Sequence, residues 1–216
     1  MNIYLDIETI PTQNPELIKH VSENVKAPGN YKDPEKIAAY IAEAADSEVL
    51  KTSFDGAYGH IICISYAIGD SDPSTLNIET VDDEKLMLEM FYSGLNAFVG
   101  DGWQNPVFVC HNIQGFDLPF LKKRSMILGV KPSPIIRFNS KPWDANPYDT
   151  MMQWDAKNFA SLDKLCKAFC IDGKGDVDGS MVYEMWKAGK HQEISDYCYD
   201  DVIKVRQLYY RMEYLG

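Results

Sequence analysis

The first predicted strand restricts the fold most, because it joins an apolar face to a pair of carboxylates. Residues 2–8 read NIYLDIE, and their side chains alternate in character. Successive side chains of a strand point to opposite faces, so the isoleucines and the leucine share one face. Asp6 and Glu8 share the other face, about 6–7 Å apart along the chain at the rise of a strand.

Asp6 and Glu8 allow two interpretations. A D-x-E pair taken alone is common, and its more frequent setting is the solvated face of an edge strand. The apolar opposite face favours a central strand instead, where two unpaired carboxylates are costly without cations. Carboxylates at this separation can share or bracket divalent metal ions, so the pair is a candidate metal site.

The remaining elements follow from hydrophobic periodicity and from the residues that begin and end helices. We expect strands at 60–68, 75–81 and 106–110, with a possible further strand at 135–138. We expect helices at 82–98, 117–128, 161–170 and 191–214. In the first of these helices, Leu86, Met90 and Leu95 should face the core. This order predicts an α/β fold with a mixed central β-sheet flanked by helices.

Residues 11–58 interrupt this pattern, since they are richer in Pro, Asn and Lys. They contain one expected helix, with Asp33 as its N-cap and Pro34 at its first position. We interpret the stretch at about 12–55 as an insertion rather than a domain. A length of 216 residues suits one domain, so residues 1–216 are expected to form a single domain.

The charge of the chain limits its functions. There are 21 Lys and Arg residues against 32 Asp and Glu residues, which gives a formal net charge of −11. Such an acidic protein is a poor candidate for bulk electrostatic binding of nucleic acid. Nucleic acid stays open as a substrate, because bound metal ions supply positive charge locally. The basic run Lys122, Lys123 and Arg124 could contact backbone phosphate, but its preferred interpretation is a solvated helix face.

Cysteine usage and hydropathy indicate the compartment. The five cysteines lie mostly within apolar segments, which favours buried free thiols in a reducing environment. No apolar run approaches the roughly 18 residues of a membrane span. The carboxylate at position 6 argues against a signal peptide. We therefore expect a cytoplasmic protein that does not act at a membrane.

Two further stretches place acids where a site could form. Asp117 stands at the start of helix 117–128, after a buried strand and a short loop, and the alternative is that it only caps that helix. Tyr197 and Asp201 are four residues apart on the last helix and share one face. The alternative for an isolated pair of this kind is a surface position beside the core stripe.

Taken in order, these stretches resemble the motifs of a known superfamily. LDIET, NIQGFD and YCYDDV are similar to the D-x-E, N-x-x-x-F-D and Y-x-x-x-D motifs of the DEDD 3'→5' exonucleases. The third motif has the tyrosine form (DEDDy), because the histidine form would need His where Asp196 stands. Flanking segments such as GHIICISYAIGD look like stand-alone exonucleases related to the proofreading domain of family-B DNA polymerases. The resemblance covers the chain outside 12–55 and implies an RNase H-like (DnaQ-like) fold.

The resemblance implies a role for each catalytic residue. Asp6, Glu8 and Asp201 match ligands of the metal that activates the attacking water, and Asp6 also matches the bridge to a second metal. Asp117 matches the acid that supports the second metal. Tyr197 matches the hydroxyl that orients the water. Two Mg²⁺ or Mn²⁺ ions are the implied cofactors, and oxygen-only ligands argue against zinc.

The resemblance also implies contacts with the substrate. Asn112 and Phe116 match positions that shape the site around the terminal nucleotide, and Thr9 and Ile10 would lie near its base and sugar. The implied activity is stepwise hydrolysis of single-stranded DNA from the 3' end to 5'-mononucleotides. A 3'→5' exoribonuclease stays open, because sugar choice depends on contacts at the 2' position. A non-catalytic nucleic-acid-binding module is the other alternative, although every catalytic motif residue is intact.

Overall fold

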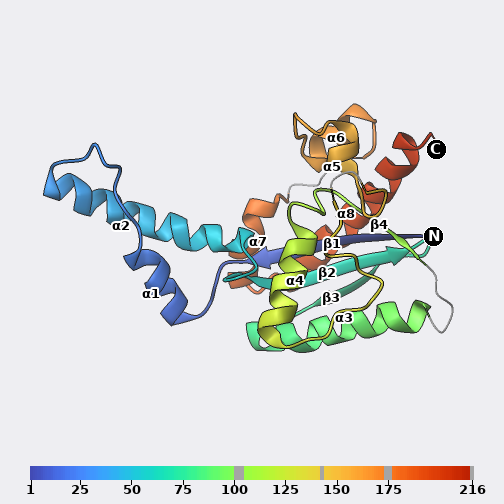
Figure 1. Cartoon of the computed structure of the whole chain (residues 1–216), viewed down its shortest axis with the longest axis horizontal. Coiled ribbons are helices and arrows are strands. Elements are labelled where there is room, and N and C mark those ends of the chain that lie inside the picture. The colour runs from blue at the N-terminus through green and yellow to red at the C-terminus, as the bar shows by residue number, and fades with distance from the viewer. Residues whose placement is uncertain (100–104, 142–143, 173–176, 215–216) are drawn as a thin grey trace.

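The computed structural model describes residues 1–99, 105–141, 144–172 and 177–214. These residues form a five-stranded mixed sheet in the order β3-β2-β1-β4-β5 (Figure 1). The strands are β1 Asn2–Ile10, β2 His60–Ile68, β3 Ser74–Asn77, β4 Val107–Cys110 and β5 Tyr148–Asp149. β1 pairs antiparallel with β2 and parallel with β4, so it is the central strand. The edge-strand interpretation of Asp6 and Glu8 is therefore wrong.

Helices cover both faces of this sheet. The α-helices are α1 Pro15–Glu23, α2 Pro34–Lys51, α3 Glu84–Val99, α4 Asp117–Leu128, α5 Thr150–Trp154, α6 Leu162–Ala168, α7 Val182–Lys187 and α8 His191–Met212. Short 3-10 helices are η1 Thr52–Phe54, η2 Val81–Asp83 and η3 Gly179–Met181. In the described part of the chain, no helix combines the length and the apolarity that crossing a membrane requires.

The alternation in β1 assigns its two faces to different helices. Its isoleucine and leucine side chains pack with α3 and α4 in the larger core. Tyr4 points the other way and packs with Val202 and Val205 of α8. Asp6 and Glu8 alternate in phase with Tyr4, and they therefore face α8.

Several helix boundaries agree with the sequence prediction. α4 begins at Asp117 and ends at Leu128, and Gly129 closes it in the left-handed conformation with φ 67°. α1, α5 and α7 were not predicted. α1 carries the same signal as α2, because Asn14 caps it and Pro15 follows, just as Asp33 and a proline begin α2.

The inner face of α3 is not the predicted one. Leu86 and Met90 are 56% and 52% exposed, so their assignment to the core is wrong, whereas Leu95 is buried as expected. The helix buries Phe91 and Tyr92 instead. Burying these two aromatic side chains removes more apolar area from water than burying Leu86 and Met90 would. This explains why the helix turns its aromatic face, rather than the predicted face, toward the core.

Two predicted strands also differ. β3 ends at Asn77, and the segment then continues into the 3-10 turn η2 rather than to residue 81. No strand forms at 135–138, which follows Pro132 and Pro134. Proline lacks the N–H that a sheet ladder needs, so Ile136 is buried from a loop.

A buried ion cluster ties α3 to α4 and β2. The Glu84 carboxylate accepts hydrogen bonds from Arg124 Nε at 2.8 Å and Nη2 at 2.7 Å, and from the Ile61 N–H at 2.9 Å. His60 Nδ1 lies 3.0 Å from the same carboxylate. Burial alone would raise the pKa of Glu84, but these partners lower it below its ordinary value. The interpretation of Arg124 as a solvated side chain is therefore wrong.

Helices α1 and α2 pack on each other as an arm that stands away from the sheet, on the left of Figure 1. Neither helix has a buried residue. The two ends of the arm are joined where it meets the sheet, because the Thr12 N–H donates to Thr52 Oγ1 at 2.9 Å. We call this place the root of the arm. A Cβ added to Gly59 would collide with the Thr52 carbonyl oxygen, so only glycine fits there. The arm is thus fastened to the end of β1.

Candidate active site

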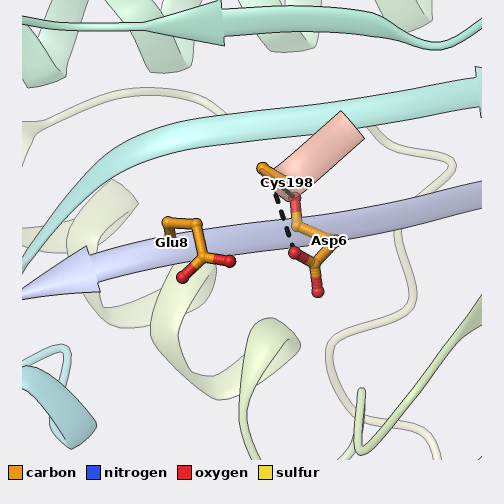
Figure 2. A group of neighbouring side chains, drawn as sticks. All are labelled: Asp6, Glu8 and Cys198. Atoms are coloured by element: carbon orange, nitrogen blue, oxygen red, sulfur yellow. Dashed lines mark hydrogen bonds between the residues drawn. The ribbon is translucent and has the colours of Figure 1, made fainter. Parts of the chain in front are cut away.

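The candidate site begins on the second half of β1. Asp6 lies opposite Ser65 of β2 and Glu8 opposite Cys63, and the register shifts between Glu8 and Thr9. Figure 2 shows both carboxylates on the same strand, with Cys198 of α8 meeting Asp6. Glu8 is only 9% exposed. The strand therefore presents two carboxylates in a largely buried place, as its central position requires.

Cys198 was not predicted as part of this site. Its thiol lies 3.5 Å from Asp6 Oδ2 and donates to that oxygen (Figure 2). One ligand atom each of Asp6, Glu8 and Cys198 lie within 4.8 Å of one another, a spacing that could hold a metal ion. Burial raises the pKa of Cys198 well above its ordinary value, so it is a hydrogen-bond donor rather than a thiolate ligand. Its place in the apolar inner stripe of the last helix, four residues after Ile194 and four before Val202, is the signal that could have found it.

Asp117 is the first helical residue of α4 and is 2% exposed. The N-cap position belongs to Phe116, and no side-chain cap bond forms there, so the capping interpretation of Asp117 is wrong. A backbone hydrogen bond links its carboxyl group to Ile7, between Asp6 and Glu8 on β1. Burial raises the pKa of Asp117 to about 8, and the negative charge of Asp149 adds to this rise.

The carboxylates carried by β1, α4 and α8 are close enough to change one another's pKa values. Burial raises the pKa of Asp6 well above its ordinary value, and the negative charges of Asp201 and Asp117 raise it further. Like charges raise each other's pKa values only when they are close in a poorly solvated place. The structure therefore brings β1, α4 and α8 together at an acidic site, where Asp201 and Asp117 add negative charge around Asp6.

Tyr197 and Asp201 complete this group from α8. They are 8% and 5% exposed, so the interpretation as a surface pair is wrong. Burial and the charges of Glu8, Asp201 and Asp6 raise the pKa of Tyr197, which also hydrogen-bonds to Asp201. The phenol thus stays protonated at neutral pH. A Cβ on Gly179 would lie 3.8 Å from the Tyr197 hydroxyl, so the chain at η3 passes beside it.

Lys204 is a second residue that sequence reasoning missed. Its side-chain nitrogen lies 3.0 Å from Asp201 Oδ1, and the residue is only 7% exposed. It follows Asp201 by three positions on α8, which places both on one face. The signal for it was a lysine in the apolar inner stripe of that helix, between Val202 and Val205. It compensates one negative charge at the edge of the site.

The loop before α4 is held by Asp149. Asp149 accepts the Asn112 N–H at 2.9 Å and the Gln114 N–H at 3.3 Å, and it also caps α5. Asn112 has φ 63°, a left-handed conformation that asparagine tolerates. A Cβ on Gly115 would collide with Asn112 Oδ1, so the side-chain amide of Asn112 lies over this glycine. Buried Asp149 therefore sets the shape of the segment that ends in Asp117.

The other predicted substrate contacts lie around this group. Thr9 is half-buried and donates to the Ser53 carbonyl oxygen at 2.7 Å, at the root of the arm. Ile10 is fully buried in the larger core, so only its main chain can face a substrate. Phe116 is half-buried and packs against Phe120 at a ring distance of 5.6 Å.

Comparison with known proteins gives a family and a fold. A family model described as "Predicted 3'-5' exonuclease related to the exonuclease domain of PolB" matches residues 54–216, which include Asp117, Tyr197 and Asp201. Asp6 and Glu8 precede the matched range. No curated protein matches the chain.

Among solved structures, the fold is similar to that of the family B DNA polymerase from the hyperthermophilic archaeon Pyrobaculum calidifontis. The TM-score is 0.60 at 19% sequence identity, over 97% of this chain. The chain spans 24% of the length of that polymerase chain. The fold is therefore an RNase H-like α/β fold, as the sequence resemblance implied.

Proposed function

Because the chain belongs to the family of predicted 3'-5' exonucleases related to the exonuclease domain of PolB, we propose that it degrades single-stranded DNA. It removes nucleotides one at a time from the 3' end and releases 5'-mononucleotides. The observation that carries this proposal is the acidic group around Tyr197, on which the charges of Glu8, Asp201 and Asp6 all act. Such a group suits hydrolysis of a phosphodiester, which needs a positioned water and cations at the leaving oxygen.

The proposed cofactors are two Mg²⁺ or Mn²⁺ ions held by Asp6, Glu8, Asp117 and Asp201, in the tyrosine-type DEDD arrangement. The donor chemistry fits, because hard divalent cations prefer carboxylate oxygens. The raised pKa values of Asp6 and Asp117 also fit, since bound cations would relieve the surplus negative charge. When bound, the ions supply positive charge to the phosphate and acidify a water molecule.

The chain's own residues hold and orient the reactants. The Tyr197 hydroxyl is protonated and can position the attacking water by a hydrogen bond, rather than act as a strong base. Lys204 and Cys198 each hydrogen-bond one carboxylate and so fix its orientation. Thr9, the main chain of Ile10, Asn112 and Phe116 are proposed to surround the terminal nucleotide.

Single-stranded DNA is the proposed substrate for two reasons. The likeness to a DNA polymerase supports DNA, while an exoribonuclease is the alternative that the assay below separates. A duplex end must fray before its last nucleotide reaches a buried site, which costs a few kcal/mol. A net charge of −11 also favours a short contact and weak processivity.

We further propose that residues 1–216 act as one domain with an insertion at about 12–55, which the arm occupies. A cytoplasmic location is part of the same proposal. The five cysteines keep their thiols reduced, and four of them are buried, while Cys170 is exposed. Reduced thiols of this kind are typical of a reducing compartment.

The test is a cleavage ladder. Oligonucleotides of DNA and of RNA, labelled at the 5' end, are incubated with the protein and Mg²⁺, Mn²⁺ or EDTA. Stepwise shortening of DNA with either ion, and intact DNA in EDTA, supports the proposal. Asp201→Asn should abolish cleavage, whereas Asp200→Asn, the exposed neighbour, should retain it. Cleavage in EDTA, release of the 5' nucleotide first, or a preference for RNA would contradict it.

A further inference from the structure

A hollow of about 390 Å³ lies beside the segment that carries Asp117. It is formed by the loop before α4, the first turn of α4, and the chain at and after α5. Its lining includes Asn112, Gly115, Pro119, Phe138, Met151 and Phe159. The volume is within the range of about 300–1,000 Å³ that small-molecule sites occupy. Among the residues that line it, only Asn112 has a substrate contact proposed above.

The chemistry of the lining selects a flat, neutral group. Phenylalanine and methionine side chains make up much of the wall, and Phe159 is 65% exposed. Among the described residues that line it, none is basic. The carboxylate of Asp149 is already taken by main-chain N–H groups of the loop and of α5. A phosphate would find no cation here, whereas an aromatic ring would find stacking partners.

The place of the hollow connects it with the catalytic group. It lies where the parallel strands β4 and β5 end, an edge at which open α/β sheets bind ligands. It shares Asn112, Gly115 and Leu118 with the segment that ends the loop and begins α4. Asp117 of that segment is buried and faces β1. A substrate whose phosphate meets the carboxylates therefore has this hollow as its neighbour on the α4 side.

We infer that the hollow is a subsite for the nucleobase second from the 3' end of the substrate, with Phe159 as its stacking platform. The inference rests on the proposed function. Thr9 lies past Glu8 on β1, on the side of the arm, and the terminal nucleotide is proposed to lie there. A strand that crosses the carboxylates then brings its next base to the side of Asn112. Stacking tolerates every base, so this subsite adds affinity without sequence preference.

The test uses 5'-labelled DNA with one abasic residue, second or fifth from the 3' end, under single-turnover conditions with Mn²⁺. On intact DNA, Phe159→Ala should lower kcat/KM by about 5- to 150-fold, the size of one lost base–aromatic stack. An abasic residue at the second position should slow the first cut by wild type to a similar extent. It should add little to the Phe159→Ala defect, because both changes remove the same contact.

Control variants separate stacking from folding. Phe159→Trp keeps an aromatic face and should retain activity, and Tyr214→Ala removes a side chain that is 95% exposed and should behave as wild type. An unchanged rate for Phe159→Ala, additive defects, or sensitivity only to the abasic residue at the fifth position would overturn the subsite while the exonuclease stands. If wild type cleaves no DNA at all, the proposed function and the subsite both fail.

Discussion

Two groups of buried carboxylates in this protein are built in opposite ways. Glu84 is surrounded by hydrogen-bond donors, among them Arg124, and its pKa is lowered. Asp6 and Asp117 have other acids as neighbours, and burial with these charges raises their pKa values. The first group is satisfied within the protein, and the second has negative charge in surplus. The difference indicates that the Glu84 cluster stabilises the folded state, whereas the acidic site is adapted to bind cations.

The largest expected effect comes from removing one charge of the acidic site. Asp6→Asn should abolish cleavage, because this residue would bridge both ions. Metal-free thermal stability should stay unchanged or rise, since one of several repelling charges is gone. Cleavage gels and thermal melts in EDTA check both halves. The exposed Asp200→Asn serves as control, and a large loss of metal-free stability in Asp6→Asn would remove the contrast with Glu84.

Glu84→Gln should lower stability and leave cleavage intact, which is the reverse of the result expected for Asp6→Asn. It leaves the Arg124 guanidinium buried with a neutral partner, so the free energy of unfolding should fall by about 3–5 kcal/mol. Activity per folded molecule should remain. Urea denaturation measures the first quantity and cleavage at low temperature the second. Glu89→Gln, an exposed change on the same helix, should alter stability by less than about 0.5 kcal/mol. If the Glu84→Gln variant were as stable as wild type, the cluster would not be what stabilises the folded state.

Tyr197→Phe tests the acidic site without changing its charge. The change removes one hydroxyl and little volume, so folding and metal binding should survive. Turnover should fall by roughly one to three orders of magnitude, the scale of a lost positioning contact. Single-turnover cleavage at saturating Mn²⁺ gives the rate, and thermal shifts with Mn²⁺ report binding separately. Equal rates for the variant and wild type would make Tyr197 a packing residue.

A further effect, expected of the protein without any substitution, is a slope of stability with pH. The ordinary pKa of Asp117 is 3.8, and burial raises it to about 8 in the folded protein. Between these values the unfolded chain is ionised while the folded chain keeps its proton. Metal-free stability should therefore fall as pH rises from about 4 to about 8. Urea denaturation in EDTA across this range measures the slope.

Two variants sharpen this pH comparison. Asp117→Asn should reduce the slope, and saturating Mg²⁺ should oppose it, because cations favour the ionised form. The lowered pKa of Glu84 has the opposite sign, since its stabilising effect is lost as pH falls through the folded value. Glu84→Gln should thus flatten only the acid side of the profile. Metal-free stability that rises from pH 5 to pH 8 would contradict the assignment for Asp117.

Much of the fold and the candidate site was predictable because local patterns carry them. Alternation in β1 assigned Asp6 and Glu8 to one face, and periodicity with Gly129 gave both ends of α4. The partners of these residues were not predictable, because they come from distant elements. Nothing local distinguishes Arg124 from its solvated neighbours until Glu84 of α3 meets it. The buried face of α3 was likewise not predictable, because it depends on packing against the rest of the core.

The topology of β1 has a consequence for synthesis of the protein. Cys198 and its partner Asp6 are 192 positions apart, and β1 also needs β4, which lies about midway between them. A ribosome makes roughly 5–20 residues each second, and amino-terminal parts emerge first. An emerging chain therefore exposes the D-x-E strand seconds before α8 exists to face it. The acidic site is therefore incomplete in the nascent polypeptide until α8 has emerged and docked.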